Sequence, residues 1–331
     1  CTQNPTMAEE WRKGWHPEKV RKAKSDKPVL IVGAGPAGLE AAQALGKRGY
    51  DVMLAEAGTE LGGRVLLEAR LPGLSAWTRV ADYRKLQLNQ LANVEVYFDS
   101  RLTADDVLGF GIPRIAIATG STWRKDGVGH LHTLPLPIAE GAQVLSPSDV
   151  MAGRLPTGKR VIVWDDDHYY MGGVMAELMA EKGYETIYAT PASEASTWTR
   201  NTMEQHFIQK RLLEKGVTVR SFTALDAIAP GEATVSCAFT GRQERIEADA
   251  VVLVTARLPN EDLCLDLLAR RAEWADAGIE SVSAIGDALA PATIAHATYA
   301  GRRYAEELDG EPLAEHALPF KREITELLPL D

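Results

Sequence analysis

Residues 29–42, V-L-I-V-G-A-G-P-A-G-L-E-A-A, decide the fold of the first part of the chain. Four apolar residues open this stretch, which indicates a strand that is covered on both faces of a sheet. A glycine-rich turn and a run of small residues follow, which indicates a tight turn into a closely packed helix. Gly49 is the expected C-cap of the helix, and a second strand at 51–55 closes on Glu56. Residues 29–56 therefore predict one βαβ unit.

The first turn of this unit has the pattern G-x-G-x-x-G. Gly33 permits the tight turn, Gly35 lets a pyrophosphate approach the backbone, and Gly38 lets the helix pack on the strand. The helix start offers unpaired N–H groups and the positive end of its dipole to phosphates. Glu56, 18 residues past Gly38, can accept hydrogen bonds from ribose hydroxyls, and its charge disfavours NADP. A turn that serves packing alone is the alternative.

A second βαβ unit, at about 160–189, starts roughly 130 residues after the first and indicates a duplicated domain rather than a short repeat. The predicted fold class is α/β, with two nested Rossmann-like domains. We expect residues 28–125 and 259–331 to form the outer domain, 126–258 the inserted domain, and the Pro- and Gly-rich stretch 125–157 the crossing between them. Strands are also expected at 94–98, 114–118, 160–164, 185–189, 250–255 and 281–285, and helices at about 173–182 and 292–308.

The second turn reads W-D-D-D-H-Y-Y-M-G-G, residues 164–173. Asp165, Asp167 and Tyr170 stand where a phosphate-binding turn has glycine. Carboxylates in a partly buried turn repel a pyrophosphate, at a cost on the order of several kcal/mol for each close pair. We therefore expect the inserted domain to keep the fold but to bind no NAD(P)H. Adjacent residues of an extended segment point to opposite faces, which favours a polar loop or a hydrogen-bond cluster over a metal site.

The composition is that of a globular protein, with 331 residues, 45% hydrophobic and 25% charged. The net charge of −10 and the lack of long basic stretches argue against nucleic-acid and membrane partners. Three cysteines cannot form a disulfide framework and no secretory signal is visible, so the cytoplasm is the expected location. Residues 1–27 are polar and are interpreted as a connecting arm, hereafter the arm, whose two tryptophans suggest that it packs on something.

The glycine turn, together with E-A-G-T-E-L-G-G-R-V (56–65), A-T-G (118–120) and I-G-D-A (285–288), resembles the nested FAD- and NAD(P)-binding domains of flavoprotein disulfide reductases. The resemblance implies that Asp287 reaches the same ligand as the first turn, with a loop cap as the alternative. Arg64 could face a phosphate or an adenine ring, or remain an ordinary surface residue. The predicted cofactor-binding residues are Gly33, Gly35, Pro36, Ala37, Gly38, Glu56, Ala57, Gly63, Arg64, Thr119, Gly120 and Asp287.

A second resemblance covers the whole chain. It rests on C-T-Q-N-P (1–5), E-E-W-R-K-G-W-H-P-E (9–18), L-P-G-L-S-A-W (71–77), L-T-A-D-D-V (102–107) and the second turn. These segments resemble the C-terminal region of the iron–sulfur flavoprotein amine dehydrogenases, which act on trimethylamine, dimethylamine or histamine and are related to dienoyl-CoA reductases. The second turn and T-A-R-L-P (255–259) are most similar to the histamine-oxidising branch.

This resemblance implies a part of a larger enzyme. An FMN-containing barrel and a [4Fe-4S] cluster would precede the chain, with Cys1 as the last cluster ligand, and in this chain Cys1 is expected to be a free thiol. The parent, expected to be a homodimer, would deaminate an amine oxidatively and pass electrons to an electron-transferring flavoprotein. This chain would hold ADP, with FAD as the alternative. We identify no catalytic acid, base or nucleophile in it. An FAD-containing NAD(P)H-dependent reductase and a non-catalytic nucleotide-binding scaffold remain alternatives.

Overall fold

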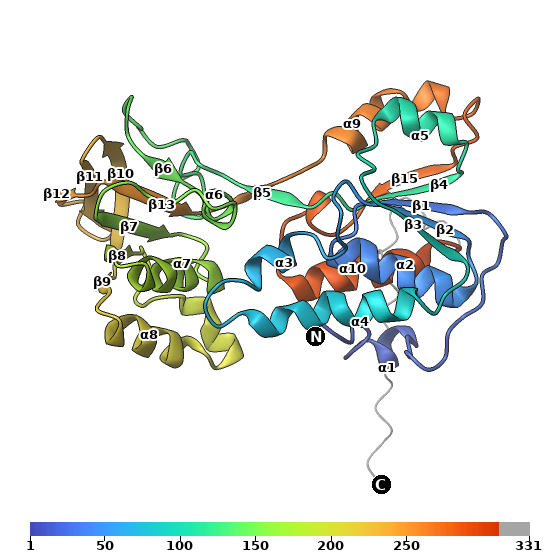
Figure 1. Cartoon of the computed structure of the whole chain (residues 1–331), viewed down its shortest axis with the longest axis horizontal. Coiled ribbons are helices and arrows are strands. Elements are labelled where there is room, and N and C mark those ends of the chain that lie inside the picture. Colours follow the sequence, from blue (N-terminus) through green and yellow to red (C-terminus); the bar gives the residue numbers. More distant parts are fainter. Residues whose placement is uncertain (311–331) are drawn as a thin grey trace, which may run out of the picture. The chain divides into compact units, whose positions relative to one another are not determined.

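A computed structural model describes residues 1–310 of the chain, which divide into two compact units (Figure 1). Unit 1 comprises Cys1–Leu66, Trp77–Gly120 and the residues from Pro259 onward. Unit 2 comprises Leu67–Ala76 and Ser121–Leu258. Each unit contains a five-stranded parallel sheet, so the predicted α/β class with parallel sheets is confirmed.

The sheet of unit 1 has the strand order β15-β4-β1-β2-β3. The chain continues from β1 to β2 and β3 on one side and then to β4 and β15 on the other, so the direction reverses between β1 and β4. This is a topological switch point, where α/β proteins bind ligands at the carboxyl ends of the strands. The strands are β1 (Val29–Val32), β2 (Val52–Ala55), β3 (Val94–Tyr97), β4 (Arg114–Ile117) and β15 (Ser281–Ala284). The helices are α1 (Glu10–Lys13), α2 (Pro36–Arg48), α3 (Arg64–Glu68), α4 (Thr78–Leu88), α5 (Ala104–Phe110), α9 (Asp262–Ala269) and α10 (Ile294–Glu307), and short 3₁₀ turns occupy Arg271–Glu273 (η3) and Gly286–Ala288 (η4).

Burial on both faces explains the unbroken apolar run of β1. Val29 and Ile31 point into the core that α2 and α10 share, and Leu30 and Val32 point into the core of α5 and α9. The helix α2 ends where expected, because Gly49 adopts the left-handed conformation with a φ of 97° and its N–H caps the last turn.

Unit 2 combines its parallel sheet, β6-β13-β7-β8-β9, with a three-stranded antiparallel sheet, β10-β11-β12. The stretch 125–157 was expected to be a crossing between the domains, but it lies entirely within unit 2 and contributes an edge strand. The helix after that strand starts at a capping box of Ser146 and Asp149, which the proline-rich composition obscured.

The strands are β5 (Ser121–Trp123), β6 (Val144–Leu145), β7 (Arg160–Asp165), β8 (Glu185–Ala189), β9 (Thr218–Arg220), β10 (Thr223–Ala229), β11 (Glu232–Cys237), β12 (Gln243–Glu247), β13 (Ala250–Val254) and β14 (Arg257–Pro259). The helices are α6 (Pro147–Met151), α7 (Tyr170–Glu181) and α8 (Gln205–Glu214), with 3₁₀ turns at Ser75–Trp77 (η1) and Thr197–Thr202 (η2).

The arm packs on α10 of unit 1. Trp15 is 4% exposed, its ring centroid lies 5.8 Å from that of Tyr299, and Lys13 Nζ lies 4.4 Å from the Trp15 ring centroid. Trp11, by contrast, is 61% exposed, so only one of the two tryptophans is buried by this packing. The arm is therefore an ordered part of unit 1 up to the first strand.

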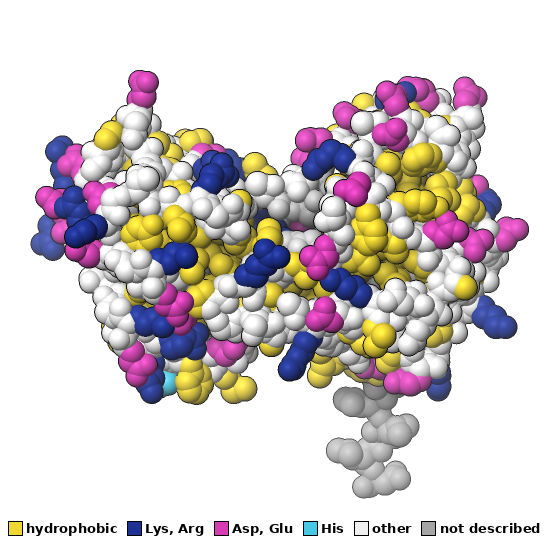
Figure 2. All heavy atoms as spheres, viewed as in Figure 1, with side chains coloured by type: hydrophobic (Ala, Val, Ile, Leu, Met, Phe, Trp, Pro, Cys, Tyr) yellow, Lys and Arg dark blue, Asp and Glu magenta, His cyan; other side chains and the backbone are white. Residues whose placement is uncertain are grey.

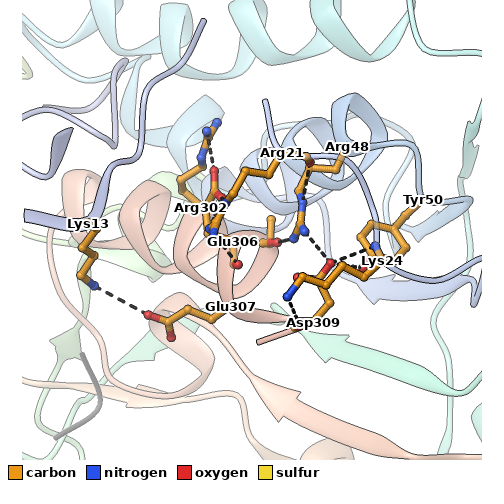
Figure 3. A network of polar contacts seen from close by, with 10 residues as sticks. Lys13, Arg21, Lys24, Arg48, Tyr50, Arg302, Glu306, Glu307 and Asp309 are labelled. Carbon is orange, nitrogen blue, oxygen red and sulfur yellow. Dashed lines mark hydrogen bonds and ion pairs between the residues drawn. The ribbon is translucent and has the colours of Figure 1, made fainter. Parts of the chain in front are cut away.

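An ion pair fixes the end of the arm to α10, and a hydrogen bond from Arg48 Nε to Arg21 O, at 3.0 Å, fixes it to α2 (Figure 3). Arg21 Nη2 lies 2.6 Å from Glu306 Oε2, and Arg302 pairs with the same carboxylate at 2.6 Å. Arg48 and the Tyr50 hydroxyl both donate to Asp309. Although burial raises the pKa of Asp309, these hydrogen bonds lower it to about 2.

Both signs of charge are interspersed over the face shown in Figure 2, as expected of a chain without long basic stretches. Among the helices of residues 1–310, none has the length and apolar character that crossing a membrane requires.

Candidate functional site

The first turn lies at the carboxyl end of β1 and cannot accept side chains at two of its glycines. Gly33 has a φ of 102°, and a Cβ there would lie 2.5 Å from the carbonyl oxygen of Ala118. A Cβ on Gly38 would lie 1.9 Å from the carbonyl oxygen of Gly33. Glycine is therefore required here by the close approach of backbone to backbone.

The start of α2 is open. Gly35 is its N-cap residue and offers no side-chain cap, and Pro36 occupies the first helical turn. A Cβ on Gly35 would meet no protein atom within 4 Å. The helix start can therefore be approached from outside by an anion, which the N–H groups and the helix dipole would favour.

Glu56 follows β2 and is held directly against the first turn. Its Oε2 accepts the N–H of Ala34 at 2.8 Å, and its Oε1 accepts the N–H of Gly58 at 2.8 Å. The carboxylate is therefore fixed beside the turn, with Ala57 exposed next to it. A negative charge in this position suits ribose hydroxyls and repels a phosphate on the same ribose.

The segment that contains Gly63 and Arg64 crosses the same turn. The N–H of Gly62 donates to Ala34 O at 2.9 Å, and a Cβ on Gly63 would lie 3.1 Å from Gly35 Cα. Arg64 Nη2 donates to Asp287 Oδ2 at 2.8 Å. The structure thus brings together two predicted residues that are 223 positions apart in the sequence.

The Gly-Asp motif lies at the start of α2. Gly286 has a φ of 60°, and a Cβ there would lie 2.6 Å from Ala37 Cβ. Asp287, which is nearly buried, accepts the N–H of Ala292 through Oδ1 at 3.0 Å. Asp287 therefore caps a loop, as in the alternative interpretation, and also faces Arg64.

The A-T-G segment completes the surroundings of the turn. A Cβ on Gly33 would contact Ala118 and Thr119, and the Thr119 hydroxyl donates to Asn260 O at 2.6 Å. The N–H of Asn260 donates in turn to Gly120 O at 2.9 Å. Asn260 was not predicted, since its only signal in the sequence is its position directly after a proline.

In unit 2, Asp165 fills the second turn from within. Its side chain is fully buried, and its Oδ1 accepts the N–H of Asp167 at 3.1 Å and the N–H of His168 at 3.0 Å. The Tyr188 hydroxyl donates to its Oδ2. A Cβ on Gly172 would lie 2.2 Å from Asp165 Cγ, so this glycine makes room for the carboxylate. The N–H groups that a phosphate would use are therefore already bonded to a carboxylate of the chain.

The neighbouring acidic residues have separate partners. Asp166 accepts the N–H of Leu131 at 2.9 Å and lies 3.5 Å from His168 Nε2. Burial raises the pKa of Asp167 and lowers the pKa of His168. Within residues 1–310, no three or more His, Cys, Asp or Glu side chains are placed so that they could hold a metal ion. The hydrogen bonds that Asp165 and Asp166 accept make the second turn a hydrogen-bond cluster, and the lack of a metal there remains a prediction.

The stability of unit 2 is expected to depend on the protonation of Asp165. Burial, and then the charge of Asp167, raise the pKa of Asp165 to about 7. The native state therefore holds a proton that the unfolded state has lost, and stability falls as the pH rises from about 4 to about 7, by roughly 1.4 kcal/mol per pH unit. Asp165→Asn mimics the protonated acid and should make this slope clearly shallower in chemical denaturation, while Asp167, whose pKa burial also raises, keeps its own part.

Asp249 is the matched control for that measurement. It accepts the N–H groups of Lys159 and Arg160, which lower its pKa to about 2. Its contribution to the free energy of unfolding is present above about pH 4 and is lost as the pH falls toward 2. Asp249→Asn should therefore change the pH dependence of stability only below about pH 4. A slope between pH 4 and 7 that is as steep in Asp165→Asn as in the native protein would contradict the prediction for Asp165.

Cys1 is exposed and is a free cysteine in this structure. Its Sγ accepts the N–H of Asn4 at 3.4 Å. Cysteine thiolates hold iron–sulfur clusters, and the role of Cys1 as such a ligand remains a prediction.

Two family models match the chain. Residues 31–87 match a NAD(P)-binding Rossmann-like domain, which contains the first turn. Residues 145–233 match the second alpha/beta domain of OYE-like proteins, which contains the second turn.

Known proteins are similar over nearly the whole chain. Dimethylamine dehydrogenase from Hyphomicrobium sp. (strain x) is 39% identical over 98% of the chain and 47% of the relative. The structure of histamine dehydrogenase from Rhizobium sp. 4-9 matches with a TM-score of 0.96 at 56% identity, over 99% of this chain and 51% of that one. The 6-hydroxypseudooxynicotine amine oxidase from Pseudomonas geniculata N1 matches with a TM-score of 0.89 at 48% identity, over 94% and 46%. The chain spans about half the length of these relatives.

Proposed function

The chain is homologous to amine dehydrogenases over nearly its full length, and on that premise we propose that it is the ADP-binding, C-terminal part of such an enzyme. The observation that carries the proposal is the first turn, with two glycines required by backbone contacts, an open helix start and a carboxylate fixed beside it. Unit 1 would bind the adenosine diphosphate, with the ribose at Glu56 and the phosphates at the start of α2.

Unit 2 is proposed to bind no nicotinamide coenzyme. Asp165 supports this, because its buried carboxylate occupies the second turn and accepts the N–H groups that a phosphate would need. The nested, Rossmann-like arrangement would then be retained for its packing, without a hydride donor in the second domain.

The chemistry of the parent enzyme would take place outside the two units described. We propose oxidative deamination on FMN, with histamine or a methylamine as the substrate class, and electron transfer through a [4Fe-4S] cluster to an electron-transferring flavoprotein. Cys1 would supply one thiolate to the cluster, and the remaining ligands would come from elsewhere. A cytoplasmic homodimer is the expected form of the parent.

Discrimination against a 2′-phosphate provides the test of the site. Titrating nucleotide-free protein in a calorimeter, we expect ADP to bind with one site per chain and its 2′-phosphorylated analogue to bind at least roughly tenfold more weakly, because Glu56 repels the added charge. Equal affinities for the two nucleotides would contradict the role of Glu56, and no binding of either would contradict the proposed function and favour a scaffold.

An FAD-containing NAD(P)H-dependent reductase remains the second candidate, because residues 31–87 match the family model of a dinucleotide-binding domain. Reduction of a bound flavin by NADH or NADPH in the purified chain would establish it.

A further inference from the structure

We propose that Arg64 and Asp287 form a gate that ends the nucleotide site of unit 1 after the second phosphate, so that the site selects a nucleoside diphosphate over a longer dinucleotide such as FAD. The inference rests on the proposed function, since it specifies which adenine nucleotide the same site holds. Neither residue has a role in catalysis here; both would act on the choice of ligand.

The position of the pair follows from the backbone around the first turn. Glu56 meets the turn at Ala34, where its Oε2 lies 2.8 Å from the amide nitrogen. The residue before Arg64 meets the turn at Gly35, and the residue before Asp287 meets α2 at Ala37. A nucleotide with its ribose at Glu56 and its first phosphate at the helix start therefore brings its second phosphate to the pair.

The ion pair is short and largely shielded from water. Arg64 Nη2 lies 2.8 Å from Asp287 Oδ2, with the two side chains 25% and 9% exposed. The other oxygen of Asp287 accepts the N–H of Ala292 at 3.0 Å. Both carboxylate oxygens thus have donors, and the loop that carries the carboxylate is fixed by one of them.

The chemistry of the two ligands differs at this point. The terminal phosphate of ADP has only an anhydride bond and carries more negative charge than either phosphate of FAD, which has an ester bond as well. The planar guanidinium of Arg64 can bind such a phosphate while it still neutralises Asp287. A ligand that continues beyond the second phosphate has to pass the pair and separate it, which leaves Asp287 nearly buried without its cation, and this is unfavourable.

Four nucleotides distinguish the gate from a general phosphate site. We would titrate nucleotide-free protein with AMP, ADP, ADP-ribose and FAD in a calorimeter. ADP-ribose is the sharpest probe, because it has the same diphosphate as ADP and only adds a sugar beyond it. We expect ADP to bind roughly 10- to 100-fold more tightly than ADP-ribose and FAD, which is the range of one hydrogen bond between charged groups.

Arg64→Met tests the guanidinium while it keeps much of the apolar stem. ADP affinity is expected to fall roughly 10- to 100-fold with AMP affinity changed less than about twofold, because AMP does not reach the pair. Arg101→Met, at an exposed site of the same unit, is the control and should leave all four affinities unchanged. Thermal unfolding of each variant would verify that the fold is intact.

The outcomes separate the two levels of the proposal. If the native protein binds ADP, ADP-ribose and FAD equally well, or if Arg64→Met weakens AMP and ADP by the same factor, the gate is wrong while nucleotide binding stands. If no adenine nucleotide binds to the native protein, the proposed function itself fails. The comparison of ADP with ADP-ribose needs no variant, so a misfolded Arg64→Met protein would not prevent the test.

Discussion

Replacing Gly38 by alanine is expected to abolish nucleotide binding by unit 1 and to lower the free energy of unfolding by about 3 kcal/mol. The new Cβ would lie 1.9 Å from the carbonyl oxygen of Gly33 and 3.4 Å from Ala118 Cβ. The nearest obstacle is backbone rather than the end of a flexible side chain, so α2 and the first turn must move apart. Chemical denaturation and a calorimetric titration with ADP would measure the two effects.

Two other glycines serve as controls for Gly38→Ala. A Cβ on Gly35 meets no protein atom within 4 Å and its φ of −72° suits alanine, so Gly35→Ala should leave stability within about 0.5 kcal/mol while it weakens ADP binding. Gly109, inside α5, also has open space around it, so Gly109→Ala should add roughly 0.5–1 kcal/mol and leave binding unchanged. Wild-type stability and affinity in Gly38→Ala would show that the close contact does not exist in solution.

Replacing Arg84 by methionine is expected to destabilise unit 1 by roughly 3–5 kcal/mol, because it leaves a buried carboxylate without the cation that donates to it. Arg84 is fully buried, and its Nε donates to Glu40 Oε2 at 2.7 Å. It also donates to Val80 O at 2.9 Å and to Thr2 O at 3.3 Å, so it joins α2, α4 and the start of the arm. Burial raises the pKa of Glu40 despite the opposing charge of Arg84. Urea denaturation would give the loss directly.

A double replacement and a surface replacement test the cause of that loss. Arg84→Met combined with Glu40→Gln removes the unpaired charge and should recover a large part of the stability. Lys210→Met breaks an exposed pair with Glu214, at 3.7 Å, and should cost less than about 1 kcal/mol. If Arg84→Met were as mild as Lys210→Met, the buried pair would not contribute as described.

The sequence predicted the elements around the first turn because their signals are local. Four consecutive apolar residues in β1 follow from a sheet with helices on both faces, and Gly49 ends α2 because it can adopt a positive φ. The motif residues Gly33, Glu56, Arg64 and Asp287 lie around one turn, and their binding of a ligand remains a prediction.

Features that depend on distant contacts were not predicted. The stretch 125–157 is rich in proline and glycine but forms part of unit 2, because its edge strand pairs with β13 from about a hundred residues further along the chain. Asn260 contacts the A-T-G segment through its backbone groups and its side-chain amide, and no periodicity reveals these contacts. The repulsive role of the second turn was expected, but not that Asp165 would bond to the N–H groups of its own turn.

The identity of the nucleotide in unit 1 is tested most directly by denaturing the purified protein and determining the mass of what it releases. We expect ADP, at about one per chain, with no absorbance in the flavin region before denaturation. Release of FAD would contradict the assignment of ADP to the first turn, and release of a nicotinamide coenzyme would contradict the proposal that the second turn binds none.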